Sequence, residues 1–142
     1  MIVVILLILP FIGALLSALA GNKAANKIAL LSTVATLLLT AKTYYDFTTG
    51  STTSFNFSTQ FLQEPNIVFS LSIDGLTMVM LILTNLLVPI IVLSGLGAVV
   101  QNSRAFYALI LLMQGALNGV FMASDGFVFY VFWELALIPI YF

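Results

Sequence analysis

Five apolar stretches, separated by short polar segments, dominate the sequence. They cover residues 2–20, 28–45, 73–100, 105–124 and 127–142. Most approach or exceed the roughly 20 residues that an α-helix needs to cross a hydrocarbon core about 30 Å thick. The pattern therefore predicts an all-α membrane protein: one transmembrane domain over residues 1–142, built as a bundle of about five transmembrane helices.

The segment 46–72 is the one long stretch that this pattern leaves outside the predicted spans. Apolar and polar residues alternate over Phe55–Phe61 and again over Ile67–Ile73, and Gln63–Asn66 between them is rich in turn-forming residues. Alternation with period two is typical of half-buried strands. Two structures fit the segment: a small β-hairpin on the membrane surface, or an irregular loop at the interface.

Composition supports the membrane assignment and excludes several kinds of chemistry. Hydrophobic residues make up 62% of the chain and charged residues 6%, whereas soluble domains are about half apolar and a quarter charged. The absence of cysteine and histidine excludes disulfides, cysteine nucleophiles, and haem or iron–sulfur ligation through those residues. The sequence contains no basic run that would predict binding of nucleic acid. It also contains no glycine-rich phosphate loop that would predict binding of a nucleotide. The chain's chemistry therefore depends on five carboxylates and four basic side chains.

Glu134 carries the carboxylate that the sequence places deepest in the membrane. About eight residues separate it from either end of its span, which at about 1.5 Å per residue is roughly 12 Å. An ionisable group there costs at least about 2.5–3.5 kcal/mol, so a functional role is its default interpretation. Desolvation favours the protonated form and a nearby ammonium the charged form, so Glu134 could change protonation as a partner charge moves. The alternative is a protonated structural glutamate bonded to a neighbouring helix.

Two amide side chains are candidates for the polar surroundings of Glu134. Gln114 and Asn118 lie one turn apart on one face of the fourth predicted span. The short connection Asp125-Gly126 predicts that this span and the next are antiparallel neighbours. The amides could thus form a polar wall beside Glu134, although hydrogen bonding between helices is the commoner role of amides in membranes. Asn85 on the third span is a further candidate for such bonding.

Asp74 and Pro139 have structural interpretations. Asp74 lies at the start of the third apolar stretch, where a carboxylate can cap a helix and favourably meet its dipole. Pro139 lacks an N–H, which leaves the carbonyl near Leu135 without its usual helical donor. This could loosen the helix beside Glu134 or admit a water; a simple packing kink is the alternative.

The few charges predict an orientation. The basic residues Lys23, Lys27 and Arg104 fall on one side of the membrane. Lys42 falls on the other side, together with four carboxylates: Asp46, Glu64, Asp74 and Asp125. The positive-inside rule then places the N-terminus and the 46–72 segment outside.

Small residues predict where helices approach closely. Gly13, Ser17 and Gly21 recur every four residues in the first span, and Gly115 and Gly119 form a G-x-x-x-G step in the fourth. Such patterns are typical of close contacts between membrane helices.

Two segments resemble a known family. FWELALIPIYF at the end of the chain, together with FSLSIDGLTMVMLILTNLLVPIIVLSG upstream, resembles the M-type antiporter-like subunit of respiratory complex I, the NADH–quinone oxidoreductase (subunit 4 in mitochondria). The resemblance runs from the third span onward, and the first two spans fit in length and order. Sister families share this fold: the L-type and N-type subunits and the Mrp Na⁺/H⁺ antiporters. The residues after Trp133-Glu134 resemble the M-type most.

The resemblance implies a proton-translocating module that couples electron transfer from NADH to quinone to proton pumping. In that family a glutamate matching Glu134 pairs with a lysine on a later helix, and further lysines continue the proton route. The chain ends at Phe142, inside an apolar run, before any such helix. We therefore expect an N-terminal fragment of the antiporter-like fold that does not pump by itself.

The resemblance also implies partners and a location. It implies no cofactor in this chain, with NADH, FMN, iron–sulfur clusters and quinone held by other subunits. The expected partners are other membrane subunits of complex I and the lipid bilayer, with no nucleic acid. We expect a multi-pass protein of the bacterial cytoplasmic membrane, in preference to the mitochondrial inner membrane. Two alternatives stay open: a subunit of a Mrp-type antiporter, or a non-transporting membrane scaffold.

Overall fold

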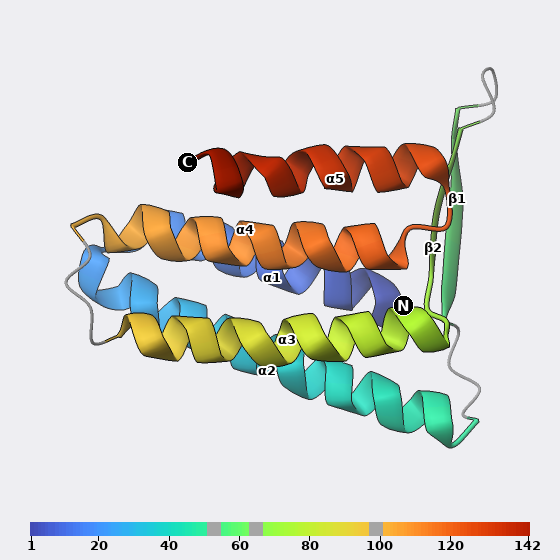
Figure 1. Ribbon diagram of the computed structural model, residues 1–142, viewed down its shortest axis with the longest axis horizontal. Coiled ribbons are helices and arrows are strands. Elements are labelled where there is room, and N and C mark those ends of the chain that lie inside the picture. Colours follow the sequence, from blue (N-terminus) through green and yellow to red (C-terminus); the bar gives the residue numbers. More distant parts are fainter. Residues whose placement is uncertain (51–54, 63–66, 97–100) are drawn as a thin grey trace.

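The computed structural model describes residues 1–50, 55–62, 67–96 and 101–142, which form five helices and a two-stranded antiparallel sheet. The elements are α1 (Ile2–Leu19), α2 (Asn22–Thr48), β1 (Asn56–Leu62), β2 (Ile67–Ser72), α3 (Gly75–Gly95), α4 (Ser103–Met122) and α5 (Gly126–Tyr141). The helices run side by side, and the hairpin lies across one end of the bundle (Figure 1). The predicted all-α membrane class is confirmed, and of the two structures that fitted the segment after α2 the small β-hairpin is the one found.

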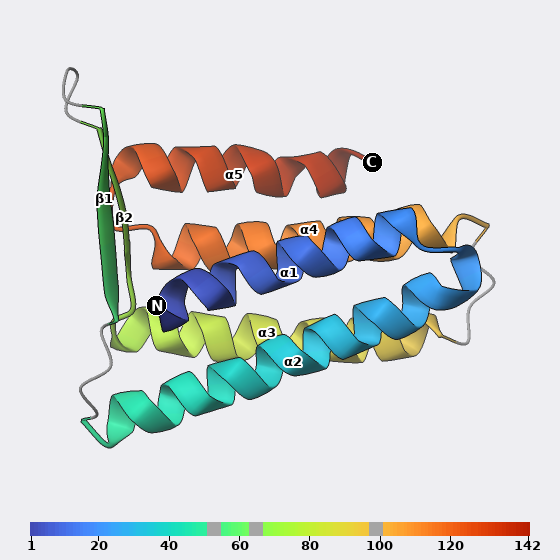
Figure 2. The ribbon, with the colours of Figure 1, turned by 180° about the vertical axis from the view of Figure 1, so that it is seen from behind.

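Four of these helices, α1 to α4, are long and apolar enough to cross a membrane. The fifth, α5, is apolar but has only 16 residues. The connections α1–α2 and α3–α4 lie at one end of the bundle, here called the basic end because it carries Lys23, Lys27 and Arg104 (Figure 2). The hairpin and the α4–α5 connection lie at the other, the hairpin end. The helices thus alternate in direction, as the pattern of spans predicted.

The helix ends differ from the predicted span boundaries, most clearly in α2. Residues Gly21–Lys27 were expected to form a polar connection, and the 46–72 segment was expected to start outside a helix. Instead α2 begins at Asn22 and continues through Thr48. Lys and Ala are good helix formers, and a helix can extend beyond the apolar region when its polar end is solvated. An apolar run indicates which residues lie in the membrane, whereas the helix itself extends beyond that run at both ends.

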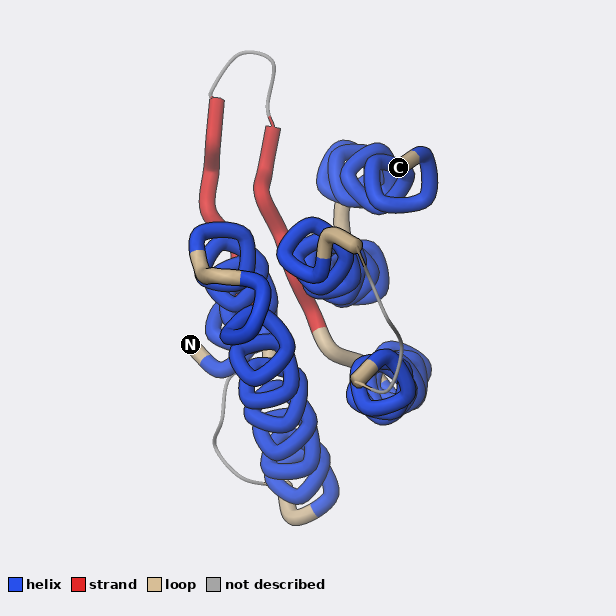
Figure 3. Tube along the Cα trace, turned by 90° about the vertical axis from the view of Figure 1, so that its left-hand side faces the viewer, coloured by secondary structure: helices blue, strands red, loops and turns tan. Residues whose placement is uncertain are grey.

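The two strands of the hairpin pair with each other, and β2 also pairs with a segment outside the hairpin. β1 and β2 pair from Asn56↔Ser72 to Leu62↔Ile67, with an irregularity in register between Gln60 and Leu62. The Ser124 N–H donates to Ser70 O at 3.0 Å, so β2 also binds the α4–α5 connection. Seen along the helix axes, the strands cross the far end of the bundle (Figure 3). The turn predicted at Gln63–Asn66 lies outside the described residues.

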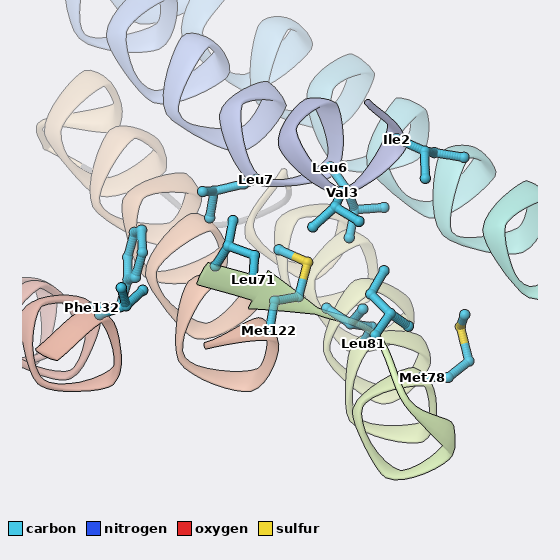
Figure 4. Packing of buried hydrophobic residues seen from close by; sticks show 11 residues of the cluster. Ile2, Val3, Leu6, Leu7, Leu71, Met78, Leu81, Met122 and Phe132 are labelled. Atoms are coloured by element: carbon cyan, nitrogen blue, oxygen red, sulfur yellow. The ribbon is translucent and has the colours of Figure 1, made fainter. Parts of the chain in front are cut away.

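The alternation in β2 points its apolar side chains into the bundle. Leu71 and Ile73 are buried, and Phe69 makes an edge contact with Phe132 of α5 at a centroid distance of 6.4 Å. Leu71 lies among side chains from three helices (Figure 4). This core contains Ile2, Val3, Leu6, Leu7, Leu71, Ile73, Met78, Leu81, Met122, Val128 and Phe132. The hairpin thus closes the hairpin end of the bundle and fixes the start of α5 against it.

Three of the predicted small-residue positions, Gly13, Gly115 and Gly119, are sites of close contact, whereas a Cβ added at Gly21 would meet nothing within 4 Å. A Cβ added at Gly13 would overlap the Ser32 side chain of α2, and one at Gly115 would lie 3.0 Å from the Phe11 ring of α1. A Cβ at Gly119 would overlap the ring of Phe132. The two glycines of the G-x-x-x-G step therefore receive aromatic rings from different helices, α1 and α5.

Substituting Gly13 with Ala should destabilise the bundle by about 1–3 kcal/mol, the usual cost of overpacking a tight contact. The added methyl must displace Ser32 and so separate α1 from α2. Thermal unfolding of the whole protein in detergent measures the change. Gly75→Ala is the matched control, because a Cβ at this helical position meets nothing within 4 Å. Equal melting temperatures for the two variants would contradict the packing argument.

Candidate functional site

Glu134 lies on the outer side of α5. The side of α5 that packs on the bundle carries Val128, Phe132 and Ala136, all buried. Glu134 is exposed, and so are its neighbours Trp133 and Leu137. Within the residues that the structure describes, no Lys or Arg side chain pairs with this carboxylate. The carboxylate is therefore presented away from α1–α4.

One polar group does contact Glu134 from its own helix. The Tyr130 phenol lies one turn earlier on α5 and is an electrostatic neighbour of the Glu134 carboxylate. Tyr130 is itself 61% exposed. Together the two side chains form a polar strip on the outer, otherwise apolar face of α5. Sequence reasoning missed Tyr130, although its i, i+4 spacing to Glu134 was a sufficient signal.

A second polar group lies inside the bundle and joins three helices. Its centre is Asn85 of α3, which is fully buried. Asn85 Nδ2 donates to Thr40 Oγ1 of α2 at 2.9 Å. Asn85 Oδ1 accepts from Gln114 Nε2 at 2.8 Å and from Asn118 Nδ2 at 3.3 Å, both on α4. We call these four residues the Asn85 network.

The direction of each hydrogen bond in the Asn85 network follows from Thr40. The single hydroxyl proton of Thr40 is donated to Thr36 O at 2.8 Å, so Thr40 Oγ1 can only accept from Asn85. The Asn85 amide must then present its oxygen to α4, where Gln114 and Asn118 present N–H groups. Their own carbonyl oxygens, Gln114 Oε1 and Asn118 Oδ1, are buried and have no partner among the described residues.

The structure thus places the predicted polar residues in two separate groups. Gln114 and Asn118 bind Asn85 between helices, and Glu134 lies on the far side of α5 from the bundle interior. The Asn85 network contains amides and hydroxyls only, with no group that titrates near neutral pH. Its evident function is to hold α2, α3 and α4 in one register.

Asp74 is the N-cap of α3. Its Oδ1 accepts a hydrogen bond from the Thr77 N–H at 2.7 Å, in the standard capping arrangement. This hydrogen bond holds the pKa of the Asp74 carboxyl below its usual 3.8. Asp125 caps α5 in a similar way, accepting from the Phe127 N–H at 2.8 Å.

Asp74→Ala should lower the thermal stability of the protein, because the Thr77 N–H loses its acceptor. A lowered folded pKa means that the carboxylate's contribution is complete above the unfolded value and is lost as the pH falls through the folded one. The stability difference from the wild type should therefore shrink as the pH falls below 3.8. Asp74→Asn, which retains an acceptor oxygen, is the control. Equal melting of wild type and Asp74→Ala at neutral pH would contradict the cap's contribution.

Pro139 lies inside α5, in its last turn. With Phe106 and Met113 of α4 it lines an apolar recess between the two helices. Pro139 has no N–H to bond the Leu135 carbonyl, so the helix hydrogen-bond ladder is interrupted one residue after Glu134. Among the described residues no cluster of three or more Asp, Glu, His or Cys side chains could hold a metal ion.

Comparison with known proteins identifies relatives of the chain. No family model matches it. The F(420)H(2) dehydrogenase subunit M of Methanosarcina mazei is 35% identical over 141 residues, which is 97% of this chain and 28% of the relative. The NADH-quinone oxidoreductase subunit M of Buchnera aphidicola is 30% identical over 152 residues, covering 100% of this chain and 30% of the relative.

A solved structure agrees with these relatives. A chain of respiratory complex I from Thermus thermophilus superposes with a TM-score of 0.79 at 30% identity, over 98% of this chain and 27% of that one. The fold and the relatives thus define a membrane subunit of the complex I class. Within this class the chain is a homologue of the M-type subunit, called chain 4 in other relatives. It spans less than a third of the length of the relatives it matches.

Proposed function

We propose that the chain forms part of a membrane-arm subunit of NADH–quinone oxidoreductase, which couples electron transfer from NADH to quinone to proton translocation. The observation that carries the proposal is homology to M-type subunits along nearly the whole chain. The complex as a whole is the enzyme, and this chain contributes no redox chemistry of its own. The redox cofactors belong to other subunits, which are its partners.

Glu134 is our candidate for the proton-path residue. Its placement on the outer face of α5, beside Tyr130, supports this role. A carboxylate near the middle of an apolar helix is costly unless a polar partner or a water-filled cavity meets it. The bundle of α1–α4 supplies neither within the described residues, so the partner must approach α5 from outside this bundle. A cationic partner there would favour the charged form, and its withdrawal would favour protonation.

The location is a further part of the proposal. Lys23, Lys27 and Arg104 lie near the starts of α2 and α4, at the basic end, whereas Asp46, Asp74 and Asp125, together with Lys42, lie toward the hairpin end. The positive-inside rule then places the basic end in the cytoplasm and the N-terminus and hairpin outside. We propose the bacterial cytoplasmic membrane as the site of this arrangement. Cysteine substitutions at Lys23 and at Asn56, labelled from either side of intact cells, test it.

F₄₂₀H₂ as electron donor is the second candidate, because one relative is named a subunit of an F(420)H(2) dehydrogenase. A Mrp-type antiporter subunit is the third candidate, and a non-transporting scaffold is the fourth. Purification of the intact complex through a tag on the whole protein separates them. We expect co-purifying redox subunits, oxidation of NADH with a quinone, and proton uptake into proteoliposomes. If the complex oxidised F₄₂₀H₂ but not NADH, F₄₂₀H₂ would be the electron donor in place of NADH. The absence of redox subunits would overturn the proposal.

A further inference from the structure

An apolar groove runs between α1 and α2 on the outside of the bundle. Both helices face the viewer in Figure 2. Leu9, Ile12 and Leu16 of α1 line one wall, and Ile28, Leu31 and Ala35 of α2 line the other. Its floor is the close contact of Gly13 with Ser32, described above. We call this feature the α1–α2 groove.

Together with a neighbouring apolar depression on α1, the α1–α2 groove has about the length of one membrane leaflet. It continues along α1 into a second apolar depression lined by Val4, Ile5 and Ile8, which shares Leu9 and Ile12 with it. From Val4 to Leu16 the helix rises by about 18 Å at about 1.5 Å per residue. Half of a hydrocarbon core is about 15 Å thick. An extended acyl chain that enters from the basic end therefore fits the groove along its length.

Two lysines continue the groove beyond its apolar end. Lys27 lies one helical turn before Leu31, and Lys23 one turn before Lys27, so each side chain lies over the next along α2. Both are exposed and form no ion pair within the described residues. At about 1.5 Å per residue, Lys27 is about 6 Å beyond Leu31. This is the depth of the headgroup layer, which is about 5–8 Å thick on each side of the hydrocarbon core.

The charge at the basic end favours an anion. Residues 20–27 and 96–104 contain Lys23, Lys27 and Arg104 and no carboxylate. The nearest acidic residues in sequence are Asp46, which follows almost the whole of α2, and Asp125, beyond α4. A zwitterionic headgroup would bring a cation to this site, whereas an anionic headgroup brings only its negative charge. The charge of this end therefore favours an anionic lipid over a zwitterionic one.

We propose that the α1–α2 groove holds an acyl chain of an anionic phospholipid whose phosphate is bound by Lys23 and Lys27. The apolar walls accept the chain, and the two ammonium groups select the headgroup. This inference does not rest on the proposed function, because neither the groove nor the lysines contact Glu134. It adds a lipid of stated chemistry to the partners of the protein.

The test uses the whole protein in its native assembly, in nanodiscs that contain phosphatidylglycerol and phosphatidylcholine. A high-resolution map should show an acyl chain between α1 and α2, with its phosphate beside Lys23 and Lys27. Native mass spectrometry should show retained phosphatidylglycerol. Each lysine near an anionic lipid is worth about fivefold in affinity, so Lys23→Gln/Lys27→Gln should lower retention by about tenfold or more.

Matched controls separate this site from general contact with lipid. Lys42→Gln removes a lysine at the opposite end of α2 and should leave retention unchanged. Ala35→Phe fills the groove and should expel the chain, whereas Leu38→Phe, on an exposed position outside the groove, should not. A protein helix in the groove, equal retention of phosphatidylcholine, or retention that is insensitive to both lysines would overturn the proposal. Proton pumping is not a readout here, so the result is independent of the role of Glu134.

Discussion

Glu134→Gln in the intact complex should reduce proton translocation by about 10²-fold or more while leaving assembly unchanged. Proton transfer by a positioned side chain commonly contributes about 10²–10⁴-fold, and glutamine keeps the size of glutamate without its proton. Packing should survive, because Glu134 is exposed on the outer face of α5 and no interhelical bond of α1–α4 depends on it. Proton uptake by proteoliposomes during electron transfer to quinone measures the effect.

The matched control for Glu134→Gln is Asp74→Asn. It neutralises a carboxylate of similar exposure, but one that caps α3 at the hairpin end. It should retain pumping, because asparagine also caps helices. Full pumping by an assembled Glu134→Gln complex would exclude the proton-path role. A selective loss of pumping in Asp74→Asn would show that the cap has a role in transport.

A substitution at Tyr130 tests whether the phenol beside Glu134 influences proton translocation. Tyr130→Phe removes the phenol that contacts Glu134 and keeps the ring. If the phenol only tunes the carboxylate, pumping should fall by less than in Glu134→Gln, and its dependence on pH should shift. Identical pH profiles for the wild type and Tyr130→Phe would show that this contact has no part in transport.

The helices could be predicted from the sequence because each apolar run is long and bounded by polar residues. The ends of the helices could not be predicted in this way, because hydropathy indicates only which residues lie in lipid. Helix α2, for example, continues past its apolar part at both ends. The period-two alternation of Phe55–Phe61 and Ile67–Ile73 indicated the hairpin as one of two structures that fit the segment. Its position was not predictable, because the contact of β2 with the α4–α5 connection depends on how the whole bundle is closed.

The polar residues illustrate a similar limit. Hydrogen bonding of Asn85 across helices was expected from its depth in an apolar span, and it is found. Its partner Thr40 was not predictable, because the relative heights of α2 and α3 depend on packing. The sequence also left open whether Gln114 faces Glu134 or another helix. That choice depends on the rotation of α4 and α5 about their axes, which Phe132 fixes by covering Gly119.

Asn85→Leu should destabilise the bundle by about 2–4 kcal/mol, because one substitution removes three interhelical hydrogen bonds of the Asn85 network. Such bonds in membranes average about 0.6 kcal/mol and reach about 1.7. The loss is increased because Gln114 and Asn118 stay buried with unpaired N–H groups. Reversible unfolding of the whole protein in mixed micelles measures the free energy. Thr43→Val is the matched control, since this buried hydroxyl bonds only to Leu39 O within its own helix.

The triple variant Asn85→Leu/Gln114→Leu/Asn118→Leu tests whether the three amides act as one unit. It also removes the two buried carbonyl oxygens that have no partner among the described residues, Gln114 Oε1 and Asn118 Oδ1. Replacing all three amides of the network by apolar side chains costs less than leaving two of them buried without their partner, and Thr40 keeps its hydrogen bond to Thr36 O. The triple variant should therefore be more stable than Asn85→Leu alone, a non-additivity that marks the residues as one unit. Additive losses across the three substitutions would show instead that each amide acts separately, and that the Asn85 network does not hold α2, α3 and α4 in register.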